Sequence, residues 1–254
     1  MEAELVERIP EEEGWQYEPK WDGFRCLLFH DRGEVFLQSN AGQPLARYFP
    51  EVTNAAEKLN PKHWALDGEL AVPLGTSFSF DHLLQRIHPA ASRVAKLAKE
   101  TPAIYIAFDL LMTEKEEVLL DSPLSERRKT LESFAKQFQR SKTLFLSPIT
   151  LDIEQVRAWL KKTGDNLDGI VCKWRDNSYR SGVSSAFQKG KTLSQYRLCR
   201  GRLSLCEKKR PGRFRHGTRL LRWRPDKAPR QCRYNQLPKP TSNLRKLLQK
   251  NRMN

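Results

Sequence analysis

The chain has 254 residues, 39% of them hydrophobic and 30% charged, which is enough for one large or two small domains with a packed core. It has no apolar run of the roughly eighteen residues that a membrane helix needs, and its first residues, MEAELVERIPEEEG, are acidic where a signal peptide would be basic and then apolar. These properties predict a cytosolic protein without membrane contact. The five cysteines lack C-x-x-C spacing, which argues against a disulfide framework and a zinc site.

The net charge of +15 is distributed unevenly along the chain. Residues 1–191 contain 26 basic and 28 acidic residues, whereas residues 192–254 contain 19 basic and only 2 acidic residues. The first segment is therefore close to neutral, as an ordinary globular domain is. Only the last quarter has the excess of Lys and Arg that favours nucleic-acid contact.

The first third of the chain predicts strands and one short helix. Residues 24–30 and 34–39 alternate apolar and polar side chains around Asp31-Arg32-Gly33, a pattern typical of a β-hairpin. Residues 49–60 predict a short amphipathic helix that begins after Pro50. Residues 63–73 predict either a second strand pair or one bent strand, because Asp67-Gly68 requires a turn or a bulge between apolar flanks.

The next part of the chain predicts further helices around one buried strand. Residues 80–100 have a helical period, and residues 102–112 form a continuous apolar run that is typical of a central strand. Ser122 and Ser125 mark a helix start in residues 122–138, and Gly164 is expected to end a helix in residues 152–164. Residues 167–174 predict another strand. The order indicates an α+β fold with mainly antiparallel sheets flanked by helices.

Five short motifs follow one another in the first three quarters of the chain. They are Lys20-Trp-Asp-Gly-Phe-Arg25, Asp67-Gly-Glu69, Phe108-Asp109, Asp168-Gly-Ile-Val-Cys-Lys173 and Lys189-Gly-Lys191. Lysine beside Asp-Gly is common in turns, so the first motif alone is a weak signal. The ordered series resembles the nucleotidyltransferase motifs of ATP-dependent DNA ligases, and YEPKWDGFR is similar to the bacterial end-joining members. The resemblance implies an ATP-grasp-like adenylation domain in residues 1–191.

In such ligases a lysine amine attacks the α-phosphate of ATP, forms lysyl-AMP and releases pyrophosphate; the resemblance implies that this lysine is Lys20. At an ordinary pKa of about 10.4, only about one lysine in a thousand is uncharged at pH 7.4, which costs roughly 4 kcal/mol. Positive charge nearby disfavours the ammonium form. Arg25, Lys173, Lys189, Lys191 and a bound Mg²⁺ are expected to supply that charge and to neutralise the phosphates.

The resemblance also implies the remaining binding roles. Glu18 belongs to the expected nucleotide-binding set, and Phe108 would stack on adenine, although a core phenylalanine is the simpler interpretation of IYIAFDLL. Glu69 and Asp168 are expected to contact the ribose or the metal ion. Asp168 stands where glutamate is commoner in the family, which shortens the reach of its carboxylate by one methylene.

Two further positions bear on the comparison with the family. Many relatives have Ser-Arg-Asn-Gly where this chain has Ser39-Asn40-Ala41-Gly42, so the arginine expected to contact ribose or DNA phosphate is absent. Either another cation, such as Arg47, replaces it, or the site is weakened. Arg127 and Arg128 also match the family, and we interpret them as helix-surface residues or structural ion pairs.

Residues 192–254 do not match the OB-fold that follows the last motif in the family. A strand similar to DCVVGGFR is expected there, but the chain has YRLCRGRLS at residues 196–204. One possible coding sequence for this stretch, shifted by one base, reads IDCVVGGFR. The segment is therefore either an out-of-frame translation of the OB-fold region, with the frame lost near Gly190, or a genuine basic arm that binds DNA phosphates.

The sequence thus predicts a monomeric ATP-dependent DNA ligase of the bacterial cytosol that uses ATP and Mg²⁺ and acts on nicked double-stranded DNA in repair or recombination. Loss of the OB-fold would limit it to self-adenylation. The alternatives are a non-catalytic nucleic-acid-binding remnant and a related RNA ligase or capping-type nucleotidyltransferase.

Overall fold

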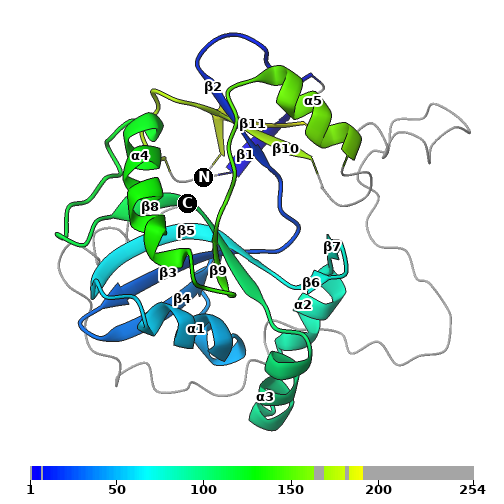
Figure 1. Ribbon diagram of the computed structural model, residues 1–254, viewed down its shortest axis with the longest axis vertical. Helices are drawn as coiled ribbons and strands as arrows, with labels where there is room; N and C mark the ends of the chain where they lie inside the picture. The colour runs from blue at the N-terminus through cyan, green and yellow to red at the C-terminus, as the bar shows by residue number, and fades with distance from the viewer. Residues whose placement is uncertain (1, 7, 163–168, 181–182, 191–254) are drawn as a thin grey trace, which may run out of the picture.

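The structure is a computed structural model that describes residues 2–6, 8–162, 169–180 and 183–190. Within these ranges the chain forms two main sheets, and the smaller one lies above the larger one in Figure 1. The four-stranded sheet has the order β1 (Glu2–Val6), β11 (Val183–Gly190), β10 (Ile170–Trp174), β2 (Trp15–Pro19). The five-stranded sheet has the order β4 (Glu34–Ser39), β3 (Phe24–Asp31), β5 (His63–Ala71), β8 (Ile104–Met112), β9 (Leu144–Leu146).

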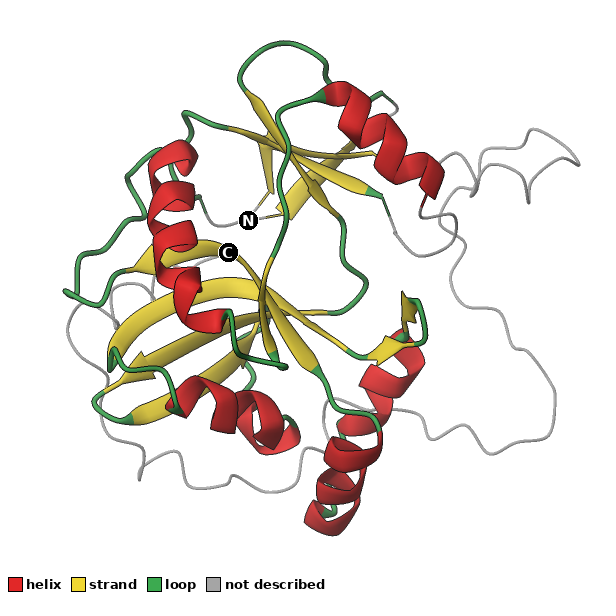
Figure 2. Cartoon of the chain, in the orientation of Figure 1, coloured by secondary structure: helices red, strands yellow, loops and turns green. Residues whose placement is uncertain are grey.

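The helices pack around these sheets (Figure 2). They are α1 (Pro50–Glu57), α2 (Phe80–Arg86), α3 (Ala91–Glu100), α4 (Leu124–Phe134) and α5 (Ile153–Lys162), with single 3₁₀ turns η1 (Ala46–Tyr48) and η2 (Ala135–Phe138). A small hairpin, β6 (Pro73–Leu74) with β7 (Ser77–Phe78), precedes α2. All strand pairings except β1 with β11 and β8 with β9 are antiparallel. The expected α+β class is confirmed, and no described helix is long and apolar enough to span a bilayer.

The alternation of side chains along the strands gives each sheet two different faces. One face of the five-stranded sheet, with Leu28, Trp64 and Leu66, packs against Val52 of α1 and Leu131 of α4 in the largest core cluster. The outer face of the four-stranded sheet is covered separately by α5, where Val156 packs against strand residues such as Cys172. The candidate site is built on the two remaining faces.

The hairpin and the bent strand expected from the sequence are both present. Arg32 and Gly33 adopt positive φ values of 49° and 92°, which suit the two-residue turn between β3 and β4. Residues 63–71 form the single strand β5, and its register with β8 shifts between Asp67 and Gly68. A Cβ atom at Gly68 would lie 2.5 Å from the carbonyl oxygen of Ile106, so only glycine fits where the two backbones approach this closely.

Two helical expectations need correction. Residues 80–100 form two helices, because Pro89 cannot donate a backbone hydrogen bond and keeps the preceding residue out of the helical region. Helix α4 is not capped by a serine side chain: Pro123 occupies the N-cap, and the N–H groups of Leu124 and Ser125 donate to the carbonyl groups of Asn177 and Arg175. Tertiary contacts thus replace the local cap. The helix stop expected at Gly164 lies outside the described residues.

A buried ion pair fixes α4 to β8. The Arg127 guanidinium donates to both oxygens of the Asp109 carboxylate, at 2.8 and 2.9 Å, and both side chains are almost fully buried. Arg127 also donates to the carbonyl groups of Ser122 and Asn177, at 2.7 and 3.2 Å. Arg127 is therefore a structural residue within the core. Of the two interpretations drawn from the sequence, a helix-surface residue or a structural ion pair, the ion pair is confirmed. Arg128 pairs with Glu132 at 2.8 Å.

Replacing Arg127 with methionine is expected to lower the free energy of unfolding by about 3–5 kcal/mol, because the Asp109 carboxylate would stay buried without its counter-charge. Urea denaturation followed by circular dichroism measures this change. The control is Arg157→Met on α5, whose ion pairs with Glu11 and Glu154 are exposed and should leave the unfolding midpoint nearly unchanged. Equal midpoints for wild type and Arg127→Met would contradict the structural role.

Candidate active site

The loop that contains Lys20 is held between the two sheets by its backbone. Lys20 directly follows β2, and its N–H donates to the carbonyl of Gly169 at 2.9 Å, just before β10 begins. The first and fourth motifs of the series, which are about 150 residues apart in the chain, therefore touch at this hydrogen bond. The side chain of the neighbouring Trp21 donates to the hydroxyl of Ser147 at 3.0 Å, which fixes the other side of the loop.

Gly23 explains why the loop lies so close to β5. A Cβ atom at this position would lie 2.1 Å from the carbonyl oxygen of Leu70 and 2.8 Å from Cγ of Glu69, so a larger residue would push the loop away. The glycine thus brings the Lys20 loop against Glu69. The positive charge of Lys20 acts on the Glu69 carboxyl, which is consistent with this placement.

The open face of the five-stranded sheet carries Arg25, Asp67, Glu69 and Phe108. Arg25 pairs directly with Glu69 in the β3–β5 register, so their side chains share a face. The guanidinium of Arg25 also lies 5.6 Å from the ring centroid of Phe108 and donates to both oxygens of Asp67, at 3.1 and 2.5 Å. Burial alone would raise the pKa of Asp67, but the Arg25 charge, together with the hydrogen bonds from Arg25 and Tyr179, lowers that pKa overall.

The open face of the four-stranded sheet carries Gln16, Glu18, Val171, Lys173 and Lys189. The strand register places Gln16 opposite Lys173, and it places Glu18 and Lys189 on either side of Val171. Directly paired residues in a sheet point to the same side, so these five side chains share one face. Cys172, between two of them, instead packs beneath α5.

The two faces meet through Lys173 and Phe108. The Lys173 ammonium lies 4.5 Å from the Phe108 ring centroid, within the range of a cation–π contact. It also lies 2.8 and 2.9 Å from the two carboxylate oxygens of Glu18. We call the group of Glu18, Lys20, Arg25, Asp67, Glu69, Phe108 and Lys173 the inter-sheet site.

The structure brings together most of the residues singled out from the sequence. Glu18, Lys20, Arg25, Glu69, Phe108 and Lys173 all belong to the inter-sheet site. Lys189 shares the open face of the four-stranded sheet and is half-buried. Asp168 and Lys191 lie outside the described residues. Phe108 is half-buried and contacts two cations, so it differs from a plain core phenylalanine.

Arg47 makes its described contacts outside the inter-sheet site. Its guanidinium donates to the carbonyl of Pro89 at 2.8 Å and lies 5.0 Å from the ring centroid of Tyr48. These partners belong to η1 and to the connection between α2 and α3. Arg47 therefore has structural contacts of its own, and its suggested use as a replacement cation remains a prediction.

Tyr179 contacts the inter-sheet site through Asp67, and the sequence did not indicate this residue. Its hydroxyl donates to Asp67 Oδ2 at 2.8 Å, and the Arg127 guanidinium lies 5.7 Å from its ring centroid. The side chain is buried and connects the pair of Arg25 and Asp67 with the pair of Arg127 and Asp109. No motif marks this residue, because a single tyrosine after a strand has no distinctive spacing.

Among the described residues, no three His, Cys, Asp or Glu side chains lie close enough together to form a metal site. Glu69 nevertheless suits Mg²⁺ chemically, because this ion is often held by one or two protein carboxylates together with substrate phosphates. Burial raises the pKa of the Glu69 carboxyl to about 8, an effect that Arg25 and Lys20 oppose and that Asp67 and Asp22 reinforce. A bound cation would favour the charged carboxylate.

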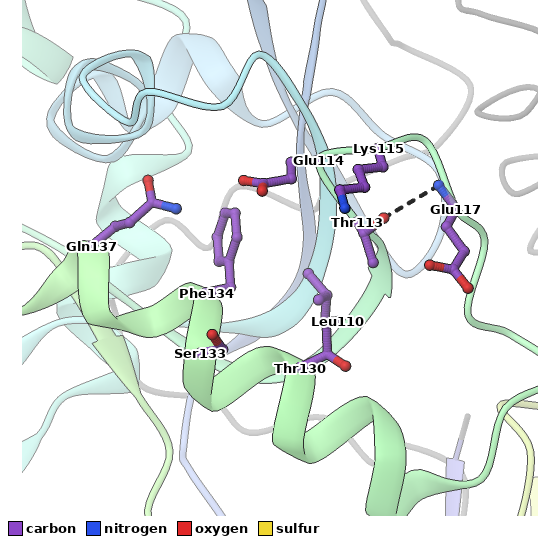
Figure 3. Close-up of a pocket in the computed structure, with 9 residues that line it drawn as sticks. All are labelled: Leu110, Thr113, Glu114, Lys115, Glu117, Thr130, Ser133, Phe134 and Gln137. Atoms are coloured by element: carbon purple, nitrogen blue, oxygen red, sulfur yellow. Dashed lines mark hydrogen bonds between the residues drawn. The ribbon is translucent and has the colours of Figure 1, made fainter.

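The structure also has a hollow of about 400 Å³ elsewhere, between the end of β8, the turn after it, α4 and η2 (Figure 3). Its buried lining residues, Leu110 and Phe134, belong to the core face of the five-stranded sheet, opposite the inter-sheet site. The other seven lining residues, including Glu114, Lys115 and Glu117, are exposed or half-buried. The hollow is therefore separate from the motif residues.

Comparison with known proteins is consistent with this arrangement. Residues 2–191 match the family model described as the ATP dependent DNA ligase domain. The chain is 42% identical over 181 residues to DNA ligase C2 of Mycolicibacterium smegmatis, covering 71% of this chain and 50% of the relative. It is 38% identical over 176 residues to DNA ligase C of Mycobacterium tuberculosis, covering 68% and 48% respectively.

Solved structures show the same fold. A mycobacterial DNA ligase D complexed with ATP and MES superposes with a TM-score of 0.57 at 28% identity, covering 74% of this chain and 60% of that one. The ATP-dependent DNA ligase of bacteriophage T7 in complex with ATP has a TM-score of 0.53 at 15% identity, covering 74% and 68%, and shows similarity of fold alone. The chain spans about half the length of the curated relatives named above.

The raised pKa of Glu69 predicts a pH dependence of stability. The pKa is about 8 in the folded state and about 4.5 in the unfolded chain, so between these values the folded state holds the extra proton. The free energy of unfolding of the wild type should therefore fall, relative to that of Glu69→Gln, as the pH rises from about 5 to about 8. Urea denaturation of both proteins in metal-free buffer measures the difference. Parallel pH profiles would show that Glu69 titrates normally.

Proposed function

The chain belongs to the ATP-dependent DNA ligase family, and from this membership we propose that it transfers AMP from ATP to Lys20. The Lys20 nitrogen would attack the α-phosphorus, a P–N bond would form, and the bond to the pyrophosphate oxygen would break. The ammonium proton must leave Lys20 before the attack. The product would be lysyl-AMP with free pyrophosphate.

The observation that best supports this proposal is the placement of the Lys20 loop. The hydrogen bond to Gly169 and the close packing of Gly23 hold the loop between a carboxylate, Glu69, and the open face that carries Lys173. A nucleophilic lysine needs positive charge nearby to lose its proton, and it needs its substrate held in line. Within one small region, the inter-sheet site offers positive charge near Lys20 and side chains that can hold the substrate.

We assign the remaining roles on the same basis. Phe108 presents a half-buried ring that can stack on adenine, and Arg25, Lys173, Lys189 and Lys191 supply positive charge for the phosphates. Glu69, with Asp168, would hold Mg²⁺, which would neutralise charge on the leaving pyrophosphate.

The substrate we propose is nicked double-stranded DNA, because the curated relatives are named DNA ligases. We place the reaction in DNA repair or recombination in the bacterial cytosol, carried out by a monomer.

Since the family match ends at residue 191, we propose that residues 1–191 are the adenylation domain. Residues 192–254, with 19 basic and 2 acidic residues, would be either an out-of-frame product or a basic arm. The gene sequence around codon 190 distinguishes these two origins.

Incubation with α-labelled ATP and Mg²⁺ is expected to label the protein through an acid-labile bond, and excess pyrophosphate should remove the label by reversing the reaction. Lys20→Ala should abolish labelling, because the variant lacks the amine that we assign as the nucleophile. Lys96→Ala, which changes an exposed lysine of α3, is the matched control and should be labelled normally. Label retained by Lys20→Ala would disprove the assignment, and labelling by GTP alone would indicate a capping-type enzyme.

Nick sealing by the purified 254-residue chain is expected to be weak or absent, because the motif series is not followed by a recognisable OB-fold strand. A nicked duplex with a labelled 5′-phosphate measures sealing, and an equivalent RNA nick tests the RNA ligase alternative. Repeated turnover on the DNA nick would contradict the limit to self-adenylation. Duplex binding without any lysyl-AMP would instead favour a non-catalytic remnant.

A further inference from the structure

The loop that contains Lys20 is joined to a second segment that also crosses between the sheets. Residues 20–23 connect β2 of the four-stranded sheet with β3 of the five-stranded sheet. Residues 147–150 cross in the opposite direction, from β9 in the five-stranded sheet to a bridge with β2. Figure 1 shows both connections, in blue from β2 to β3 and in green from β9 toward α5. The indole N–H of Trp21 donates to the Ser147 hydroxyl at 3.0 Å, so this hydrogen bond ties one crossing segment to the other.

The acceptor of this hydrogen bond is itself fixed in the fold. Ser147 is fully buried, and its backbone N–H donates to the carbonyl of Ala107 on β8 at 2.8 Å. Ala107 directly precedes Phe108, the ring to which we assign adenine. The hydrogen bond from Trp21 therefore sets the position of the Lys20 loop relative to the strand that carries the proposed base-binding residue.

The Trp21 ring is also held from a second direction. It forms an edge-to-face contact with Phe78 of β7, with ring centroids 5.5 Å apart and an interplanar angle of 87°. A polar contact with one element and an aromatic contact with another together restrict the half-buried side chain. Because Trp21 directly follows Lys20, this restriction extends to the backbone from which the Lys20 side chain extends.

The position of that backbone matters for the proposed reaction, because the Lys20 nitrogen must lie in line with the bond that breaks. A displacement of about 1 Å from the productive position can slow a reaction by about a hundredfold. The hydrogen bond from Lys20 to Gly169 and the close packing of Gly23 hold the two ends of the loop through its backbone. Trp21 adds a side-chain contact between these two constraints.

We propose that Trp21 is a positioning residue for the transfer of AMP to Lys20, which acts through its hydrogen bond to Ser147 and not through contact with the nucleotide. This inference rests on the proposed function, because it concerns the placement of the same nucleophile. The groups that we assign to nucleotide binding lie on the strands and keep their positions when this bond is lost. Its removal should therefore slow the transfer and leave the affinity for ATP unchanged.

The test is a double-mutant cycle with Trp21→Phe, Ser147→Ala and the double variant. One arm measures the single-turnover rate of self-adenylation at saturating ATP, and a second measures the dissociation constant for ATP in a Lys20→Ala background. We expect each single variant to reduce the rate by about tenfold to a hundredfold and to leave the dissociation constant unchanged. The double variant should be no slower than the slower single variant, because both remove the same bond.

The two substitutions protect the test against misfolding. Trp21→Phe keeps an aromatic ring that can contact Phe78, and Ser147→Ala removes a single oxygen atom from a buried position. Ser147→Ala therefore tests the same hydrogen bond if Trp21→Phe does not fold.

Trp64→Phe is the matched control. The Trp64 indole N–H also donates to an oxygen at 3.0 Å, the carbonyl of Pro61, but this residue lies in the core cluster on the other face of the five-stranded sheet. The control variant should lower the unfolding midpoint and leave the adenylation rate unchanged. If it slows adenylation by the same factor as Trp21→Phe, general destabilisation explains the loss, and the positioning role is rejected.

Amide hydrogen exchange without ATP tests the placement of the loop independently of the chemistry. Loss of the bond should speed exchange at the Lys20 N–H, which donates to Gly169, and should leave the exchange of α4 unchanged. Unchanged exchange in residues 20–23 of both variants would show that the bond does not hold the loop, and it would reject the proposal.

The remaining outcomes separate this inference from the proposed function. If the wild type forms no lysyl-AMP, the proposed function fails, and hydrogen exchange still decides whether the bond holds the loop. If the wild type is labelled and the variants react at the wild-type rate, only the inference fails. Losses that multiply in the double variant, or a weaker affinity for ATP that accounts for the slower reaction, would likewise reject the positioning role alone.

Discussion

The buried carboxylate of Asp67 is the group on which the inter-sheet site most depends. It is fully buried on the central strand β5, and it accepts hydrogen bonds from Arg25 of β3 and from Tyr179 of the segment after β10. A buried carboxylate is tolerated only when its charge and its lone pairs are satisfied, so these contacts must form together. Through Asp67 the five-stranded sheet is thus connected to a segment that continues from the four-stranded sheet.

The buried polar contacts of Asp67 continue through Tyr179 into other parts of the fold. The ring of Tyr179 lies beneath the Arg127 guanidinium, and Arg127 forms a buried pair with Asp109. The segment around Asn177 accepts the first N–H groups of α4 as well as a hydrogen bond from Arg127. Helix α4, strand β8 and the segment after β10 therefore share one polar network. The consequence for function is that Arg25 and Phe108, which lie at the edge of this network, have a rigid support.

Much of the architecture could be predicted from local signals. The hairpin around Gly33 and the helix that begins at Pro50 depend on backbone preferences of a few adjacent residues. The break at Pro89 and the start of α4 were misjudged for different reasons. The helical period of residues 80–100 continues across Pro89 although the helix does not, and the acceptors for the first N–H groups of α4 come from residues about fifty positions later in the chain.

The sequence by itself determined the family, and it predicted the chemistry and most members of the site, because the order of short motifs around Lys20, Glu69 and Phe108 is visible in one dimension. Only the tertiary structure decided which charges meet. It paired Lys173 with Glu18 and Asp67 with Arg25, and it added Tyr179, which no motif marks. The physical reason is that the energy of a charge depends on its burial and on its partners, and both are set by strand register across long separations in the chain.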